Sequence, residues 1–391
     1  MQDHLMNTYN RLAVSFDHGD GVYLWDKAGK QYLDALCGIS VTSLGHNHPA
    51  VTSAIIEQAP KLLHTSNLYH IENQQCLADL LCSAAEMDRA FFGNSGAEAN
   101  EAAIKLARLH GHARGIDKPD IIVMQGSFHG RTMATLSASG SRKVQAGFEP
   151  LVSGFVRAPY NDMDALHNIA ANNRNVVAVM LEPVQGEGGI VIPDPGYLAA
   201  IRELCDQQGW LMMLDEIQSG MGRSGRMFAF QHEGITPDVL TLAKALGNGI
   251  PIGACLTTNR ASDVFKPGNH GTTFGGNPFA CRVGIAVVQT LLREQLAERA
   301  AKQGNRLAET LEIALGEYPV VREVRNLGLL VGIELDSDAP GLAAIALENG
   351  LLINVTAGNV VRLLPPLIIK KKHIDEITER LTRSLEQWLE A

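Results

Sequence analysis

The sequence predicts an α/β protein whose large domain holds a mostly parallel sheet flanked by helices, followed by a smaller α+β domain. Residues 120–130, 176–186 and 210–220 are each a short apolar run that ends in a polar, glycine-bearing loop. Helical stretches such as 196–209 lie between these runs. Strands that alternate with helices are typical of a parallel sheet. From about residue 285 long helical segments replace the alternation, which indicates a second domain.

The first elements follow from local patterns. Residues 21–36 predict two short strands around a "KAGK" turn. Residues 48–64 and 71–85 each predict a helix, because apolar side chains recur at helical spacing. Residues 89–111 predict a short strand, a turn and a long helix.

The later elements predict the smaller domain. Residues 281–319 are nearly all helical in pattern, and 327–335 predict a strand. A helix, two short strands and a closing amphipathic helix, which we expect to dock on this domain, complete the chain. We therefore expect a large domain over 46–285 and a small domain over 286–391. The 1–45 segment is expected to join the small domain, because its hairpin has no obvious place in a parallel sheet.

Composition excludes several classes of protein. The 391 residues are 46% hydrophobic and 19% charged, which is typical of a globular chain with a large core. The net charge of -9 and the lack of a basic run argue against a nucleic-acid partner. The apolar runs are too short to span a membrane. The first residues lack the apolar region of a secretory signal, and no cysteines form C-x-x-C, so we expect reduced thiols and a cytoplasmic location.

One lysine stands out for chemistry. Lys244 is the single charge in the apolar, glycine-rich stretch 241–254. Burial lowers the pKa of a lysine, and a neutral amine can form a Schiff base with a carbonyl. A lysine that extends to the surface is the commoner case, so the neighbouring motifs decide between the two interpretations.

Two further motifs favour a pyridoxal phosphate site. Asp215 and Glu216 end an apolar strand, where a carboxylate needs a cationic partner such as a protonated pyridinium. Ser95, Gly96 and Ala97 open a helix, whose free N–H groups attract phosphate. Each motif alone is common, since most strand-end aspartates cap or pair locally. Together with Lys244 they supply the three groups that this cofactor needs.

The stretch 214–254 resembles the signature of the class III, or ornithine-type, pyridoxal-phosphate aminotransferases. The resemblance covers nearly the whole chain and includes "FFGNSGAEANEAAIKLAR", "GSFHGRT", "EPVQGEGG", "GTTFGGNPFAC" and "VRLLPP". It implies the fold-type I architecture, with a mostly parallel seven-stranded sheet in the large domain, and a homodimer.

The resemblance also implies roles around the cofactor ring. Lys244 matches the Schiff-base lysine, which moves the proton between the substrate Cα and the cofactor C4′. Asp215 matches the carboxylate on the pyridine nitrogen, and Gln218 matches the group that contacts the ring hydroxyl. Ile217 and Phe128 would pack on opposite faces of the ring.

The phosphate contacts are implied in the same way. Ser95, Gly96 and Ala97 match the phosphate loop, and Glu216 belongs to the same cofactor-binding stretch as Asp215. Thr273 resembles a phosphate contact that one subunit donates to its partner, which is why a dimer is expected.

Substrate carboxylates would be held by two arginines, because a guanidinium grips a carboxylate by two hydrogen bonds. Arg131 resembles the arginine for the donor α-carboxylate, and Arg362 resembles the arginine for the α-carboxylate of 2-oxoglutarate. Glu187 matches a glutamate that pairs with Arg362 while the donor is bound. Thr272 lies where such enzymes approach the substrate, and Tyr9 aligns with a tyrosine that contacts the donor.

Length and the compact N-terminal segment resemble the acetylornithine branch of the family. This implies transfer of the δ-amino group of N2-acetylornithine to 2-oxoglutarate, giving N-acetylglutamate 5-semialdehyde and glutamate in arginine biosynthesis. Succinylornithine, ornithine, 4-aminobutyrate or N-succinyl-diaminopimelate are alternative donors. Aminomutase or decarboxylase chemistry on this scaffold, or a cofactor-free binding protein, are further alternatives. His46 and His48 favour turn and packing roles, so no metal is expected.

Overall fold

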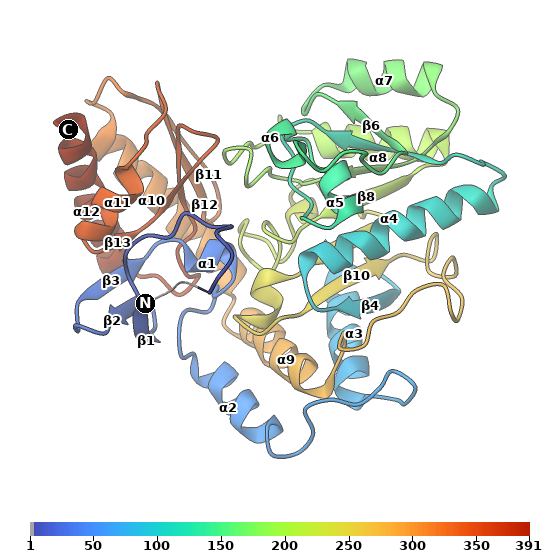
Figure 1. Ribbon diagram of the computed structural model, residues 1–391, viewed down its shortest axis with the longest axis horizontal. Coiled ribbons are helices and arrows are strands. Elements are labelled where there is room, and N and C mark those ends of the chain that lie inside the picture. Colours follow the sequence, from blue (N-terminus) through green and yellow to red (C-terminus); the bar gives the residue numbers. More distant parts are fainter. Residues whose placement is uncertain (1–3) are drawn as a thin grey trace.

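The computed structural model describes residues 4–391. Figure 1 shows a large body, built around one central sheet, beside a smaller body that holds the C-terminus. The N-terminal strands lie against the smaller body.

The central sheet is mixed but mostly parallel. Only β10 runs antiparallel to its two neighbours, β4 and β9. The other five strands, from β9 to β6 in the sheet order, pair with one another in parallel. The spatial order is β4 (Arg89–Gly93), β10 (Gly253–Thr257), β9 (Val239–Leu242), β8 (Leu211–Asp215), β7 (Val176–Leu181), β5 (Asp120–Met124) and β6 (Phe155–Ala158). The seven-stranded sheet is the one expected from the resemblance.

Helices cover both faces of this sheet. Successive residues of a strand point to opposite faces. Thus Met212 packs in the same core as Ile201 of α8, and Met213 packs in the core that contains Ala103 of α4. The helices of this body are α2 (Pro49–Gln58), α3 (Glu72–Ala85), α4 (Gly96–Ala113), α5 (Met133–Ala138), α6 (Arg142–Gln145), α7 (Met163–Asn172), α8 (Tyr197–Gln208) and α9 (Pro278–Arg293).

The smaller body contains a four-stranded antiparallel sheet and helices. Its sheet order is β11 (Val321–Leu327), β12 (Leu330–Leu335), β15 (Val360–Leu363) and β14 (Asn354–Thr356). Its helices are α10 (Leu296–Leu315), α11 (Leu342–Glu348) and α12 (Lys371–Leu389). The strand predicted over 327–335 is present as β12, which begins at Leu330. Strand β11 was not predicted, and the chain turns between β11 and β12. Gly328 makes that turn with a φ of 57°.

The N-terminal hairpin completes another four-stranded sheet. Its strands are β1 (Phe16–Asp20), β2 (Tyr23–Asp26), β3 (Gln31–Asp34) and β13 (Leu351–Leu352). Strand β3 pairs in parallel with β13, and Leu33 lies opposite Leu351. The N-terminal strands are therefore joined to the C-terminal part of the chain through β13, and α1 (Cys37–Ser40) leads from β3 toward α2. The domain boundaries expected from the sequence, at residues 45/46 and 285/286, stay predictions.

A fully buried arginine joins these parts. Arg223 Nε donates to Ser40 Oγ at 3.0 Å, and Nη2 donates to Ser43 Oγ at 3.0 Å. Its Nη1 donates to the main-chain oxygens of Leu329 and Pro365. One guanidinium thus holds the segment after α1, the β11–β12 turn and the segment after β15.

Among residues 4–391, no helix is both long enough and apolar enough to cross a membrane.

Candidate active site

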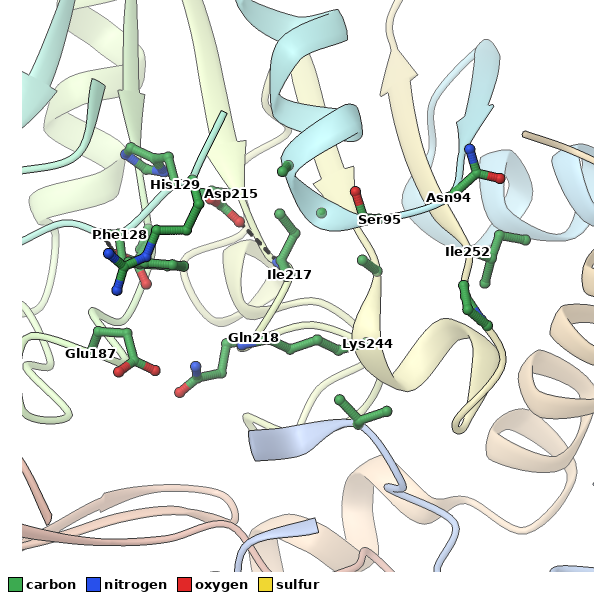
Figure 2. Close-up of a pocket in the computed structure, with 18 of the residues that line it drawn as sticks. Asn94, Ser95, Phe128, His129, Glu187, Asp215, Ile217, Gln218, Lys244 and Ile252 are labelled. Carbon is green, nitrogen blue, oxygen red and sulfur yellow. Dashed lines mark hydrogen bonds and ion pairs between the residues drawn. The ribbon is translucent and has the colours of Figure 1, made fainter. Parts of the chain in front are cut away.

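A cavity of about 460 Å³ lies where the strands of the central sheet end, beside the start of α4. Ten of the residues that the resemblance singles out line it: Ser95, Gly96, Ala97, Phe128, Arg131, Glu187, Asp215, Ile217, Gln218 and Lys244. Figure 2 shows that Lys244 extends across this space toward Gln218, with Ile217 and Asp215 on one side. The carboxyl ends of parallel strands are the usual place for a ligand in such folds.

The chain presents Lys244 in an unusual backbone conformation. Lys244 begins the short 3-10 helix η2 (Lys244–Gly247) with a φ of 43°, in the left-handed region. This conformation costs a residue other than glycine about 1–2 kcal/mol. Burial in the cavity wall lowers the pKa of Lys244 to about 8. Because strain of this kind concentrates at functional sites, both features support a chemical role for the amine.

Asp215 is buried and held at both of its oxygens. Oδ2 accepts a hydrogen bond from Asn100 Nδ2 at 2.7 Å and lies 2.8 Å from His129 Nδ1. Oδ1 accepts a hydrogen bond from the main-chain N–H of Ile217 at 3.1 Å. The carboxylate is therefore fixed in one orientation at the cavity wall.

The start of α4 forms another wall. Ser95 caps the helix by accepting a hydrogen bond from the Glu98 N–H at 3.2 Å, and Gly96 and Ala97 line the cavity. Strand β10 passes so close that a Cβ on Gly253 would overlap the main-chain oxygen of Ser95. The N-terminus of a helix attracts anions because its first N–H groups lack helical partners.

Arg362 lies behind the cavity and is fully buried. Its Nη1 donates to Glu187 Oε1 at 2.6 Å and to Gln218 Oε1 at 3.3 Å. Burial acts to raise the pKa of Glu187, but the charge and hydrogen bond of Arg362 lower it overall. Nη2 of Arg362 is buried without a hydrogen-bond partner among the described residues. The Arg362–Glu187 pair expected from the sequence is thus formed, and the Nη2 group of Arg362 stays available to a ligand.

A wider groove opens outward from the cavity. It shares Phe128, Arg131 and Glu187 with the cavity and encloses about 1300 Å³. Arg131 is exposed, and its guanidinium carbon lies 5.6 Å from the centre of the Phe128 ring. This arginine is therefore accessible to a ligand that enters through the groove.

Besides Arg362, four of the predicted site residues lie outside the cavity lining. The Glu216 carboxylate accepts hydrogen bonds from the main-chain N–H groups of Ala229 and Phe230, so it points into the protein. Thr272 and Thr273 line a separate surface pocket, and Tyr9 is 71% exposed. A role for Thr273 in the site of a partner subunit is compatible with this exposed position.

The two histidines considered as metal ligands have local partners. His46 Nε2 lies 2.8 Å from Asp34 Oδ2, a carboxylate partner that the sequence did not indicate. His48 caps α2 by accepting a hydrogen bond from the Ala50 N–H. Within residues 4–391 no group of three or more His, Cys, Asp or Glu side chains could hold a metal ion.

Comparison with known proteins agrees with this geometry. The family of class-III aminotransferases matches residues 5–385. The chain belongs to the class-III aminotransferases. An acetylornithine aminotransferase from Nitrosomonas europaea is 52% identical over 388 residues, which cover 99% of each chain.

Solved structures of two aminotransferases are similar to this chain over nearly its whole length. Acetylornithine aminotransferase from Elizabethkingia anophelis has a TM-score of 0.89 and 36% identity, covering 98% of this chain and 96% of its own. Ornithine aminotransferase from Toxoplasma gondii has a TM-score of 0.95 and 35% identity, covering 99% and 93%. That enzyme was solved with partial occupancy of PLP at its active site.

Sequence reasoning missed three buried polar residues around Asp215. His129 and Asn100 contact its Oδ2, and Glu182 lines the cavity beside them. Burial and the nearby charge of Asp215 raise the pKa of Glu182 to about 7. Asn100 and His129 each lie within a motif quoted for the resemblance, three positions after Ala97 and one position after Phe128. That proximity was the available signal.

The side chains of the cavity fit a cofactor that has an aldehyde, a basic ring nitrogen and a phosphate. The cavity places a lysine of lowered pKa, a fixed carboxylate and a helix N-terminus around one space. These are the three functional groups that pyridoxal phosphate requires. Ile217 and Phe128, also in the lining, supply apolar surface for a planar ring.

Proposed function

We propose that this class-III aminotransferase uses pyridoxal 5′-phosphate to transfer the δ-amino group of N2-acetylornithine to 2-oxoglutarate. The products are N-acetylglutamate 5-semialdehyde and glutamate, a step of arginine biosynthesis. The observation that carries the proposal is that Lys244 and Asp215 line one cavity with the open end of α4. The 52% identity to an acetylornithine aminotransferase supports this donor.

The chain's own residues would hold the cofactor at three points. Lys244 binds its aldehyde, Asp215 pairs with its ring nitrogen, and the N–H groups at Gly96 and Ala97 bind its phosphate. Gln218 contacts the ring hydroxyl. When bound, the cofactor withdraws electrons from the substrate carbon that loses its proton.

Lys244 would then move that proton. Its pKa of about 8 leaves a substantial neutral fraction near physiological pH, which a general base requires. The Asp215 carboxylate lines the same cavity, where Asn100 and His129 hold it in place.

The two arginines would separate the two substrates. Arg131, open to the groove, binds the α-carboxylate of the donor. Glu187 holds Arg362 at 2.6 Å, and this pair would stay closed while the donor is bound. When 2-oxoglutarate enters, its α-carboxylate replaces Glu187 on Arg362, because a guanidinium offers a carboxylate two parallel hydrogen bonds.

The oligomeric state and location follow from the same assignment. The exposed Thr273 would contact the phosphate bound by a second subunit, so the enzyme acts as a homodimer. All six cysteines lie within the described residues and are free, which supports a reducing, cytoplasmic setting.

The test is a visible absorption spectrum of the purified protein loaded with pyridoxal phosphate. We expect a yellow band that fades fastest with N2-acetylornithine and more slowly with ornithine or 4-aminobutyrate. If the band fades only with another amine, the proposed donor is wrong but the transamination chemistry stands. No band after addition of the cofactor overturns the proposal.

A further inference from the structure

The environment of Arg362 contains a residue with no assigned role. Strands β14 and β15 pair antiparallel, and Asn354 lies directly opposite Arg362 in the register. Asn354 Oδ1 accepts a hydrogen bond from Arg362 Nε at 3.1 Å. The two Nη groups are on the other side of the guanidinium, where Nη1 contacts Glu187 and Gln218.

Two of the partners of Arg362, Asn354 and Glu187, differ in how freely they can move. Asn354 is part of the β14 strand, so its side chain is carried by the sheet that also carries Arg362. Glu187 lies in a loop with its side chain 35% exposed. The Glu187 main chain is fixed, however, because its carbonyl accepts a hydrogen bond of 2.6 Å from Thr356 Oγ1 on the same strand β14.

Asn354 and Arg362 are thus held by the sheet, whereas the Glu187 side chain can move. The guanidinium is planar, so a hydrogen bond at Nε sets the directions in which both Nη groups point. When the Glu187 side chain leaves, the bond to Asn354 keeps the plane in place. One N–H of Nη1 is then released beside the unpartnered Nη2, while the other stays with Gln218, and the two Nη groups face an incoming carboxylate together.

We propose that Asn354 is a positioning residue that orients Arg362 for the carboxylate of 2-oxoglutarate and acts only in the acceptor half of the reaction. The donor carboxylate binds Arg131 and is independent of it. This inference rests on the proposed function in taking a five-carbon dicarboxylate as acceptor, but it does not depend on which ω-amine is the donor.

Ligands that do not react can test the proposal on the holoenzyme. Glutarate has both carboxylates of 2-oxoglutarate but no keto group. N2-acetylnorvaline has the donor carboxylate but no δ-amine. Binding of both is measured by calorimetry in the parent and in Asn354→Ala. We expect glutarate to bind about tenfold more weakly to the variant, the size expected for a lost hydrogen bond to a charged group. N2-acetylnorvaline should bind with unchanged affinity.

A second asparagine provides the matched control. Asn359 lies between β14 and β15, and its Nδ2 donates to the Leu335 carbonyl at 2.8 Å, away from Arg362. Asn359→Ala should leave glutarate binding within about twofold. If Asn354→Ala is unstable, Asn354→Val removes the acceptor with a side chain that suits a strand, and the same loss is expected.

Half-reactions give an independent readout. In Asn354→Ala the rate at which the donor bleaches the yellow band should stay at the parent value, while the apparent KM for 2-oxoglutarate rises about tenfold. Equal weakening of both ligands, an unchanged affinity for glutarate, or an equal effect of Asn359→Ala would overturn the role of Asn354. If the parent does not bind glutarate, the dicarboxylate acceptor is wrong and the positioning role falls with it. A different preferred amine alters only the donor.

Discussion

His129 Nδ1 lies 2.8 Å from Asp215 Oδ2, and both side chains are buried. A carboxylate only accepts, so Nδ1 carries the proton in this contact. Burial acts to lower the pKa of His129, but the hydrogen bond and charge of Asp215 outweigh it and raise the pKa. The histidine therefore offsets the charge of Asp215 inside the protein.

Replacing this histidine should destabilise the fold. We expect His129→Leu to lower the free energy of unfolding by about 2–3 kcal/mol, because a buried carboxylate loses a charge-assisted hydrogen bond. Urea unfolding measures the change. His232→Leu is the control, since His232 is exposed and its ring contacts the Ser224 carbonyl instead of a buried carboxylate, and a loss of about 1 kcal/mol or less is expected. Equal losses in the two variants would contradict a specific role for the contact with Asp215.

Lys244→Ala should abolish transamination and leave the protein folded. Removal of a group that transfers a proton costs about 10²–10⁴-fold, and loss of the covalent cofactor link adds to this. Turnover is measured with N2-acetylornithine and 2-oxoglutarate, and circular dichroism checks the fold. Lys30→Ala should keep normal turnover, since Lys30 caps the end of α11 at the Glu348 carbonyl. Near-normal turnover in Lys244→Ala would exclude the assigned chemistry.

Glu216 should make stability depend on pH. Burial raises its pKa from 4.5 to about 7, so the folded protein binds a proton that the unfolded chain releases. This contribution is complete below the unfolded pKa and is lost as the pH rises through the folded pKa. The shift corresponds to roughly 3 kcal/mol. Urea unfolding between about pH 5 and pH 8 should show the decline, and Glu216→Gln should flatten it. An identical slope in the variant would argue against this assignment.

Gly253→Ala should disturb the start of α4. The added Cβ would overlap the Ser95 carbonyl, a main-chain atom that cannot move aside without shifting the helix. We expect a loss of about 1–3 kcal/mol in stability, as for other overpacked sites, and weaker retention of pyridoxal phosphate. Gly271→Ala is the control for stability, because a Cβ there meets open space. A stable Gly253→Ala protein would show that strand and helix can separate without cost.

The sequence was most informative where one residue carries a strong constraint. A lone lysine in an apolar stretch and a carboxylate at a strand end are visible without coordinates, and both line the cavity. Partners that are distant in the chain were not visible. Asn100 and His129 meet Asp215 only because α4 and the loop after β5 converge on the end of β8. Glu216 follows Asp215 directly, yet it points to Ala229 because adjacent residues at a strand end face opposite ways.

The order of the strands was harder to predict than their existence. The antiparallel β10 has the same apolar pattern as a parallel strand, since both faces of the sheet are covered by helices. The β11–β12 hairpin was missed because β11 (VREVRNL) is largely polar, and its turn, at Gly328 and Leu329, lies inside the apolar run 327–335 that predicted a single strand. A single glycine in such a run does not by itself distinguish a bend from a turn.

The pairing of β3 with β13 has a consequence for the newly made chain. Strand β3 cannot pair with β13 until Leu351 has been made, more than three hundred residues after Leu33. At ordinary rates of synthesis this interval lasts about 15–60 s. During that time the strand offers unpaired main-chain groups to any neighbouring chain. Several nascent chains on one polysome therefore expose an unpaired strand β3 at the same time. Aggregation or early chaperone binding should begin at this strand.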